Sequence, residues 1–175
     1  MRTLILILTF LMVFPFVSCT SSNNTNYATR MKEVEKTSII PAFRGLYAAS
    51  NKSVEEFNEK INEAKRSILI PIVYGHYAAS NKSLEEFSSR IKDAKEASIE
   101  PIYRGVYAIS DKSIEEFNTR LKEAETAKIL PLFRGHYAGS EKTTREFLLR
   151  AKDAKDAGVP VKYCGEYAAS NHTLH

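Results

Sequence analysis

The sequence predicts an α/β fold built from tandem βα units of 30 residues. The first observation is internal repetition: segment 41–70 is followed by near-copies that start at residues 71, 101 and 131, and a partial copy starts at 161. The second is a capped amphipathic pattern in the second half of each unit, and the third is a short apolar run before a glycine in the first half. Repetition at such a period is typical of arrays whose neighbouring units share one core.

The second half of each unit is predicted to be an amphipathic helix. In the first complete unit Phe57, Ile61 and Ala64 recur at spacings of three and four, which places them on one helical face. Ser53 followed by Glu56 forms the sequence of a capping box, which marks a helix start. Both signals recur in the later units, and the apolar stripe alone appears upstream at Tyr27, Met31 and Val34. A further helix is therefore expected before the first complete unit.

The first half of each unit is predicted to be a strand. Runs such as 39–43 and 69–73 are short, apolar and rich in β-branched or aromatic residues, which fits a strand buried on both faces of a parallel sheet. The proline in each run opposes this, because proline cannot donate to a ladder. The alternative makes 41–50 a second helix that begins at proline, and the fold an αα solenoid. A glycine in the middle of each such helix would cost about 1 kcal/mol, so we favour the βα interpretation.

The expected assembly is an open arc, a solenoid or a partial barrel with parallel strands. Strand–helix–strand connections are right-handed, so identical units place all their helices on one side of the sheet. The chain supplies five such strands, which is too few for a closed barrel of eight. The other apolar face of the sheet then needs a cover, and self-association is the simplest one.

The N-terminal segment reads as a targeting signal. Arg2 precedes an apolar stretch over 3–17, as in a secretory signal peptide covering residues 1–18. The sequence Phe16-Val17-Ser18-Cys19 resembles the lipobox of bacterial lipoproteins. The resemblance implies that lipid attached to Cys19 anchors the protein at a membrane of the cell envelope; the alternative is a secreted protein. Residues 19–26 would be a polar tether, and residues 27–175 one repeat domain.

The composition argues against several classes of site. Two cysteines, Cys19 and Cys164, make neither a disulfide framework nor a zinc site. The net charge of +4 comes from interspersed charges of both signs, which is no footprint for nucleic acid. His76 and His136 occupy a position where other units carry leucine, valine or glutamate, so they are expected to be exposed and to bind no metal. No cofactor is expected.

The candidate ligand-binding residues belong to the loop between strand and helix. In a βα array these loops meet at one edge together with the helix N-termini, and a cationic, aromatic edge fits an anionic or saccharide ligand. The competing interpretation is packing for the tyrosines and solvent or ion pairs for the arginines. The candidates are Arg44, Arg104, Arg134, Tyr47, Tyr77, Tyr107 and Tyr137.

A catalytic site is not expected, because the loop residues that differ between units form no nucleophile–base or acid–base pair. These residues are Asp111, Glu141, Cys164 and Glu166. The sequence therefore predicts a membrane-anchored or secreted binding, interaction or structural module of the cell envelope. Its expected partners are the membrane through Cys19, a protein or an anionic or saccharide polymer, and a second copy of itself. The alternative is a partial-barrel enzyme completed by dimerisation.

Overall fold

The computed structural model describes residues 26–175, so the expectations for the signal peptide and for Cys19 lie outside the described residues. Within this range the chain forms helices and no strand. The helices are α1 (Tyr27–Val34), α2 (Arg44–Ala49), α3 (Val54–Lys65), α4 (Tyr74–Ala79), α5 (Leu84–Glu96), α6 (Pro101–Ile109), α7 (Ile114–Thr126), α8 (Pro131–Gly139), α9 (Thr144–Asp156) and α10 (Val161–Ala169), with a short 3-10 turn η1 (Pro71–Val73) before α4.

The predicted βα fold is wrong, and the αα solenoid alternative fits. The segments taken for strands enter the even-numbered helices instead. Pro101 and Pro131 are the first residues of α6 and α8, where a missing backbone N–H breaks no helical hydrogen bond. The odd-numbered helices agree with the sequence. In α3, Ser53 accepts from the Glu56 backbone N–H, and the Glu56 carboxylate accepts from the Ser53 N–H, which confirms the capping box.

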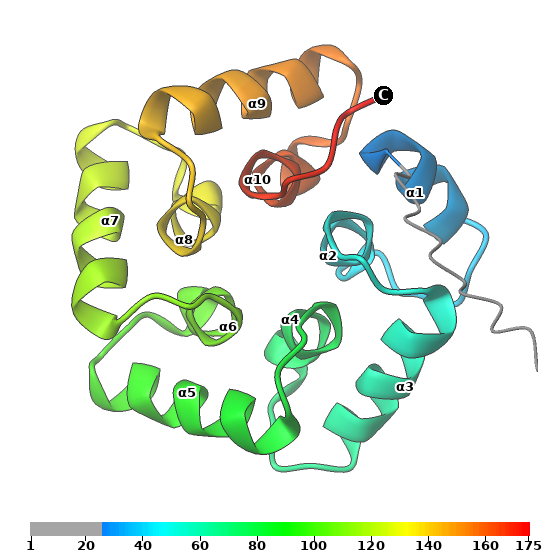
Figure 1. The fold of residues 1–175 in the computed structure, drawn as a ribbon, viewed down its shortest axis with the longest axis vertical. Helices are drawn as coiled ribbons and strands as arrows, with labels where there is room; N and C mark the ends of the chain where they lie inside the picture. Colours follow the sequence, from blue (N-terminus) through cyan, green and yellow to red (C-terminus); the bar gives the residue numbers. More distant parts are fainter. Residues whose placement is uncertain (1–25) are drawn as a thin grey trace, which may run out of the picture.

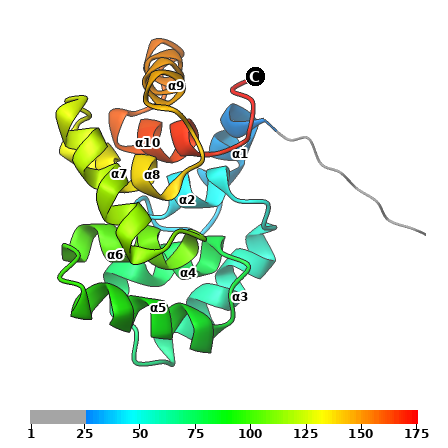
Figure 2. The ribbon, with the colours of Figure 1, turned by 60° about the vertical axis from the view of Figure 1, so that its left-hand side comes forward.

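The ten helices form a closed ring of two layers (Figure 1). The even-numbered helices stand around a central axis and are seen end-on, while the odd-numbered helices run along the perimeter. Figure 2 shows the same helices after a turn of 60° about the vertical axis. Each outer helix packs on the inner helix that follows it in the chain, and each inner helix packs on the next. Because α10 also packs on α2, the expected open arc is closed.

The two ends of the ring meet inside one helix. The Tyr27 N–H donates to the Thr173 carbonyl at 2.9 Å, and the Ala28 N–H donates to the Leu174 carbonyl at 3.2 Å. The equivalent bond elsewhere is an ordinary helical one, from the Phe57 N–H to the Ser53 carbonyl. Residues 26–175 comprise 150 residues, which is five units of 30. The C-terminal residues thus supply the missing first turn of α1.

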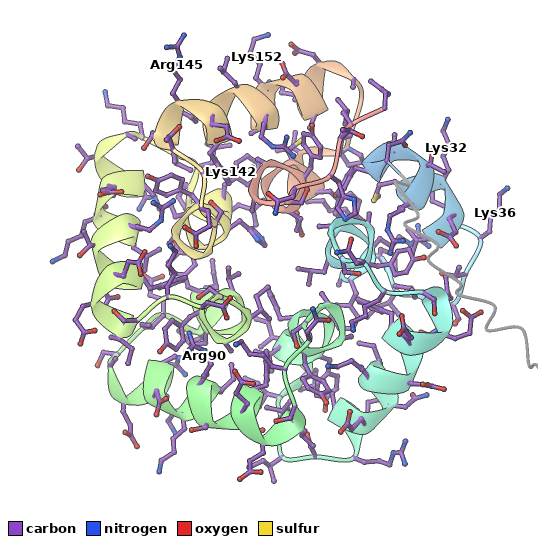
Figure 3. The ribbon with its side chains drawn as sticks, in the orientation of Figure 1. Lys32, Lys36, Arg90, Lys142, Arg145 and Lys152 are labelled. Atoms are coloured by element: carbon purple, nitrogen blue, oxygen red, sulfur yellow. The ribbon has the colours of Figure 1, made fainter. Side chains whose placement is uncertain are left out.

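A repeated clamp joins the layers. Arg90 of α5 donates to the carbonyls of Tyr107, Ala108 and Lys112, and its guanidinium lies 4.3 Å from the centre of the Tyr107 ring. Figure 3 shows Arg90 between α5 and α6. Tyr107 and Ala108 lie in the last turn of α6, and Lys112 lies in the connection to α7, so Arg90 holds the end of the inner helix and the start of the next outer helix. The cations at the equivalent position in the other units are Arg30, Lys60, Arg120 and Arg150.

Glycine permits the close approach of neighbouring inner helices. A Cβ placed on Gly75 of α4 would lie 2.5 Å from Phe43 Cδ1, just before α2. A Cβ on Gly45 of α2 would lie 2.7 Å from Tyr163 Cδ1 of α10. The interface that closes the ring therefore uses the same packing as the interfaces between consecutive units.

Candidate functional site

One position on the inner helices differs in chemistry from unit to unit. It lies between a glycine and a tyrosine that are the same in every unit. Packing between helices explains the glycine in each unit, so a ligand is not needed to account for it. The five residues at this variable position, called the axial set below, are Leu46, His76, Val106, His136 and Glu166. A ring with five-fold repetition thus acquires an asymmetric centre, as a site for a single small ligand requires.

A cavity of about 220 Å³ lies against the axial set. Leu46, Val106, His136 and Glu166 line it, together with small residues one turn further along the inner helices. Serines at the C-terminal ends of these helices surround its mouth: Ser50, Ser110, Ser140 and Ser170. Their hydroxyls are occupied within the helix ends, as in Ser110, whose Oγ donates to the Tyr107 carbonyl at 2.8 Å. The other polar side chains that line the cavity are His136 and Glu166.

The two histidines stack beside each other at the axis. Their ring centroids are 6.4 Å apart with 18° between the ring planes. Burial lowers the pKa of His76 to about 4, and burial together with the neighbouring His76 lowers the pKa of His136 to about 3. Both imidazoles are therefore uncharged at neutral pH. Nδ1 of His76 is buried and has no hydrogen-bond partner within residues 26–175.

Glu166 is the acid of the axial set. Burial raises the pKa of Glu166 to about 7, against smaller opposing effects of a hydrogen bond from its own backbone N–H and of Lys162 one turn earlier. Its Oε2 is buried, and no described residue donates to it. Its carboxyl group lies against the next helix of the ring, since a Cβ on Gly45 would be 3.0 Å from Glu166 Cδ. A buried carboxylate oxygen without a donor is costly, so an external donor to Oε2 would be favoured here.

Replacing Glu166 by glutamine is expected to stabilise the protein at high pH. Between pH 4.5 and about 7 the folded chain keeps a proton on Glu166 that the unfolded chain releases, so stability falls as the pH rises through this window. Glu166→Gln removes that loss. We expect the variant to be equal to the parent near pH 4 and more stable by about 1–3 kcal/mol at pH 8. Urea unfolding at pH 4, 6 and 8 measures the difference, and a difference that does not grow with pH contradicts it.

The arginines proposed as ligand-binding residues lie at the other end of the inner helices. Nε of Arg44 donates to the Ile39 carbonyl at 3.3 Å, and Arg104 and Arg134 make the same bond to Ile99 and Ile129. Each arginine thus holds the connection that leads into its inner helix. Cys164 stands at this position in the last unit, and its thiol faces the Val159 carbonyl in the same way.

The proposed tyrosines lie between the two layers. Tyr47 is fully buried, its ring meets Phe57 edge-on, and its hydroxyl donates to Glu33 Oε2 at 2.9 Å. Tyr77, Tyr107 and Tyr137 are buried in the same way. The structure therefore does not bring the arginine and tyrosine rows to one edge, and the tyrosines serve packing, which was the competing interpretation.

The histidines were misplaced by the sequence interpretation. His76 and His136 were expected on an exposed loop, whereas they lie at the axis and belong to α4 and α8. Glu166 had been noted only as a residue that differs between units. The signal that finds all three is the helical register of the inner helices, which places the residue after each glycine toward the centre.

The opposite end of the ring is apolar. Half-exposed aliphatic side chains gather where the inner helices begin: Ile40, Ile70, Ile72, Ile102, Leu130, Leu132 and Val161. Lys162 lies among them in the sequence, with its ammonium 4.7 Å from the Tyr163 ring centre. The expected self-association through an apolar surface stays a prediction.

Two further features are absent from residues 26–175. Within residues 26–175, no three or more histidine, cysteine, aspartate or glutamate side chains are grouped as a metal site. None of the helices in this range has the length and hydropathy needed to cross a bilayer. In a comparison with known proteins, no family model, no curated protein and no solved structure matched the chain.

Proposed function

We propose that this protein is a binding module of the cell envelope whose axial cavity holds one small ligand. The observation that carries the proposal is the axial set, where unlike side chains occupy equivalent positions around one cavity. Ligand sites are commonly concave and apolar with a few polar groups, and they collect side chains with shifted pKa values. His136 and Glu166 are such groups, among walls supplied by residues such as Leu46, Val106 and Ile109.

Filling the cavity is expected to abolish binding while preserving the fold. Ala79 lines the cavity, and the equivalent residue of the third unit is Ile109, so Ala79→Ile introduces a side chain that an inner helix already carries here. A fragment library screened by NMR should shift the methyl signals of Leu46, Val106 and Ile109 in the parent and leave them unchanged in Ala79→Ile. Leu149→Ala, on the exposed face of α9, is the matched control and should behave as the parent. Equal shifts in Ala79→Ile would place binding elsewhere.

The envelope location is part of the same proposal and rests on the leader and Cys19, which the structure does not describe. Attached acyl chains contribute about 0.8 kcal/mol for each buried CH₂, so two or more chains would hold the ring at a membrane. If cells are supplied with a labelled fatty acid, the parent protein should incorporate the label and the Cys19→Ser variant should not; this result would support a lipid anchor at Cys19. Labelling of neither protein contradicts it and leaves a secreted module.

A catalytic role is the second candidate. The pKa of Glu166 is raised to about 7 while that of His136 is lowered to about 3, and opposite shifts of titratable groups in one cavity are typical of acid–base sites. The partial barrel suggested by the sequence has no strands to build it within the described residues. Recovery of a bound ligand separates the two roles: a binding module releases it unchanged, and an enzyme releases a product.

A further inference from the structure

The axial cavity contains one acid and no fixed cation. Of the residues that line it, only Glu166 carries a charge at pH 8, because the His136 imidazole is neutral there. The nearest cation along α10, Lys162, has its ammonium over the Tyr163 ring, 4.7 Å from its centre. The cations of the clamp lie between the two layers, over the tyrosine rings. The Glu166 carboxylate therefore has no partner among the described residues for its buried Oε2.

The C-terminal ends of the inner helices already have cationic partners. A helix C-terminus carries a partial negative charge, which favours cations, and the clamp cations donate to the carbonyls there, as Arg90 does to Tyr107 and Ala108. The negative charge that a ligand meets in the cavity is therefore that of Glu166.

The apolar lining and the volume of the cavity indicate what the uncharged part of a ligand would be. Leu46, Val106 and Ile109 present aliphatic surface, and Ala49, Ala79, Gly139 and Ala169 leave the open space between the helices. About 220 Å³ lies below the range of cavities that hold drug-sized ligands, about 300–1,000 Å³. The imidazole of His136, uncharged at neutral pH, is available as a further hydrogen-bonding group.

We infer that the axial cavity takes a small organic cation, a primary ammonium on a compact apolar body, with the ammonium on Glu166 and the body among Leu46, Val106 and Ile109. The inference rests on the proposed function and names its ligand class. An ammonium supplies the donor that Oε2 of Glu166 lacks, and a charged hydrogen bond in a site of low dielectric constant is stronger than a neutral one. An alcohol of the same length would keep the apolar contacts but would lose the ion pair between the ammonium and the Glu166 carboxylate.

The test compares three probes of equal length at pH 8 and low salt: n-butylammonium, 1-butanol and butyrate. NMR titration of the full ring, followed at the methyl groups of Leu46, Val106 and Ile109, gives a dissociation constant for each. We expect n-butylammonium to bind at least tenfold more tightly than 1-butanol, and butyrate to bind most weakly. Glu166→Gln should weaken n-butylammonium at least tenfold and leave 1-butanol unchanged.

The matched control is Glu141→Gln. Glu141 is an exposed acid paired with Lys112, outside the cavity, so its removal should change none of the three constants. If 1-butanol or butyrate binds as tightly as n-butylammonium, the ligand class is wrong while the cavity remains a binding site. If none of the three probes shifts the cavity methyl groups, and the fragment library shifts none either, the proposed function fails together with this inference.

Discussion

A chain that ends at Gly158 is expected to lose the folded ring. The truncation removes α10, and with it the contacts to α8, α9 and α2 together with the turn that completes α1. The buried side chains Tyr163 and Tyr167 leave the core as well. Because each unit of a repeat array is stabilised by its neighbours, opening the ring withdraws support from both sides of the break. We expect circular dichroism to show no cooperative thermal transition, where the parent shows one.

The control for this truncation is a circular permutant without a linker. His175 is joined directly to Asn26, and the chain is opened before Ile68, an exposed loop residue. The join restores the spacing found in the other units, so the helix runs unbroken from the Thr173 cap into α1. We expect a melting temperature within about 5 °C of the parent, since the permutant keeps the contacts of every other element. A permutant that is unfolded, or that folds only with a linker, would contradict the split-helix closure.

Substituting alanine for both Gly75 and Gly135 is expected to lower the free energy of unfolding by up to about 4 kcal/mol. Overpacking at one such site costs about 1–3 kcal/mol, and distant sites add. A Cβ on Gly75 would meet the Phe43 ring at 2.5 Å, and one on Gly135 would meet the Tyr103 ring at 2.8 Å. Alanine is the better helix former by about 1 kcal/mol at each site. A lower free energy of unfolding in the double variant would therefore show that the steric clash outweighs the gain in helix propensity. Urea unfolding measures it.

Gly139→Ala is the matched control for the glycine pair. Three other units carry alanine at this position, as Ala49, Ala79 and Ala169, so the inner helices already accept a methyl group there. The new Cβ would lie 2.9 Å from Val106 Cγ1 and at an ordinary contact distance of 3.5 Å from Ser110 Cβ and the Val106 carbonyl. We expect a change in unfolding free energy within about 1 kcal/mol. A loss as large as that of the double variant would mean that the tight glycine contacts have no special role.

The outer helices could be predicted from the sequence because their signals are local. The stripe of Phe57, Ile61 and Ala64 and the box of Ser53 and Glu56 need no tertiary partner to be recognised, and α3 follows them. The inner helices could not be predicted with the same security. The low helix propensity of glycine makes Gly45 an argument against a helix in this segment. The tight contact with the neighbouring inner helix explains why glycine stands there.

The candidate site, too, could be predicted only where its signals are local. The difference of Glu166 from its counterparts was visible in the sequence, but its burial at the axis depends on ring closure. His76 and His136 were judged as loop residues, because the strand interpretation placed them after a strand. The arginines drew attention because they repeat in three units and the tyrosines because they repeat in every unit, yet both serve packing and helix ends. The residues that vary at a repeated position point to the cavity.

The measurement that tests the closed ring most directly is a nuclear Overhauser contact between the Tyr163 ring and the Hα protons of Gly45. The two residues belong to the last and first inner helices, and the ring carbon Cδ1 lies 2.7 Å from where a Gly45 Cβ would be. In a monomeric sample the contact should be as strong as that between Tyr103 and Gly135. Its absence, with the Tyr103–Gly135 contact present, would show an open array and remove the axial cavity with it.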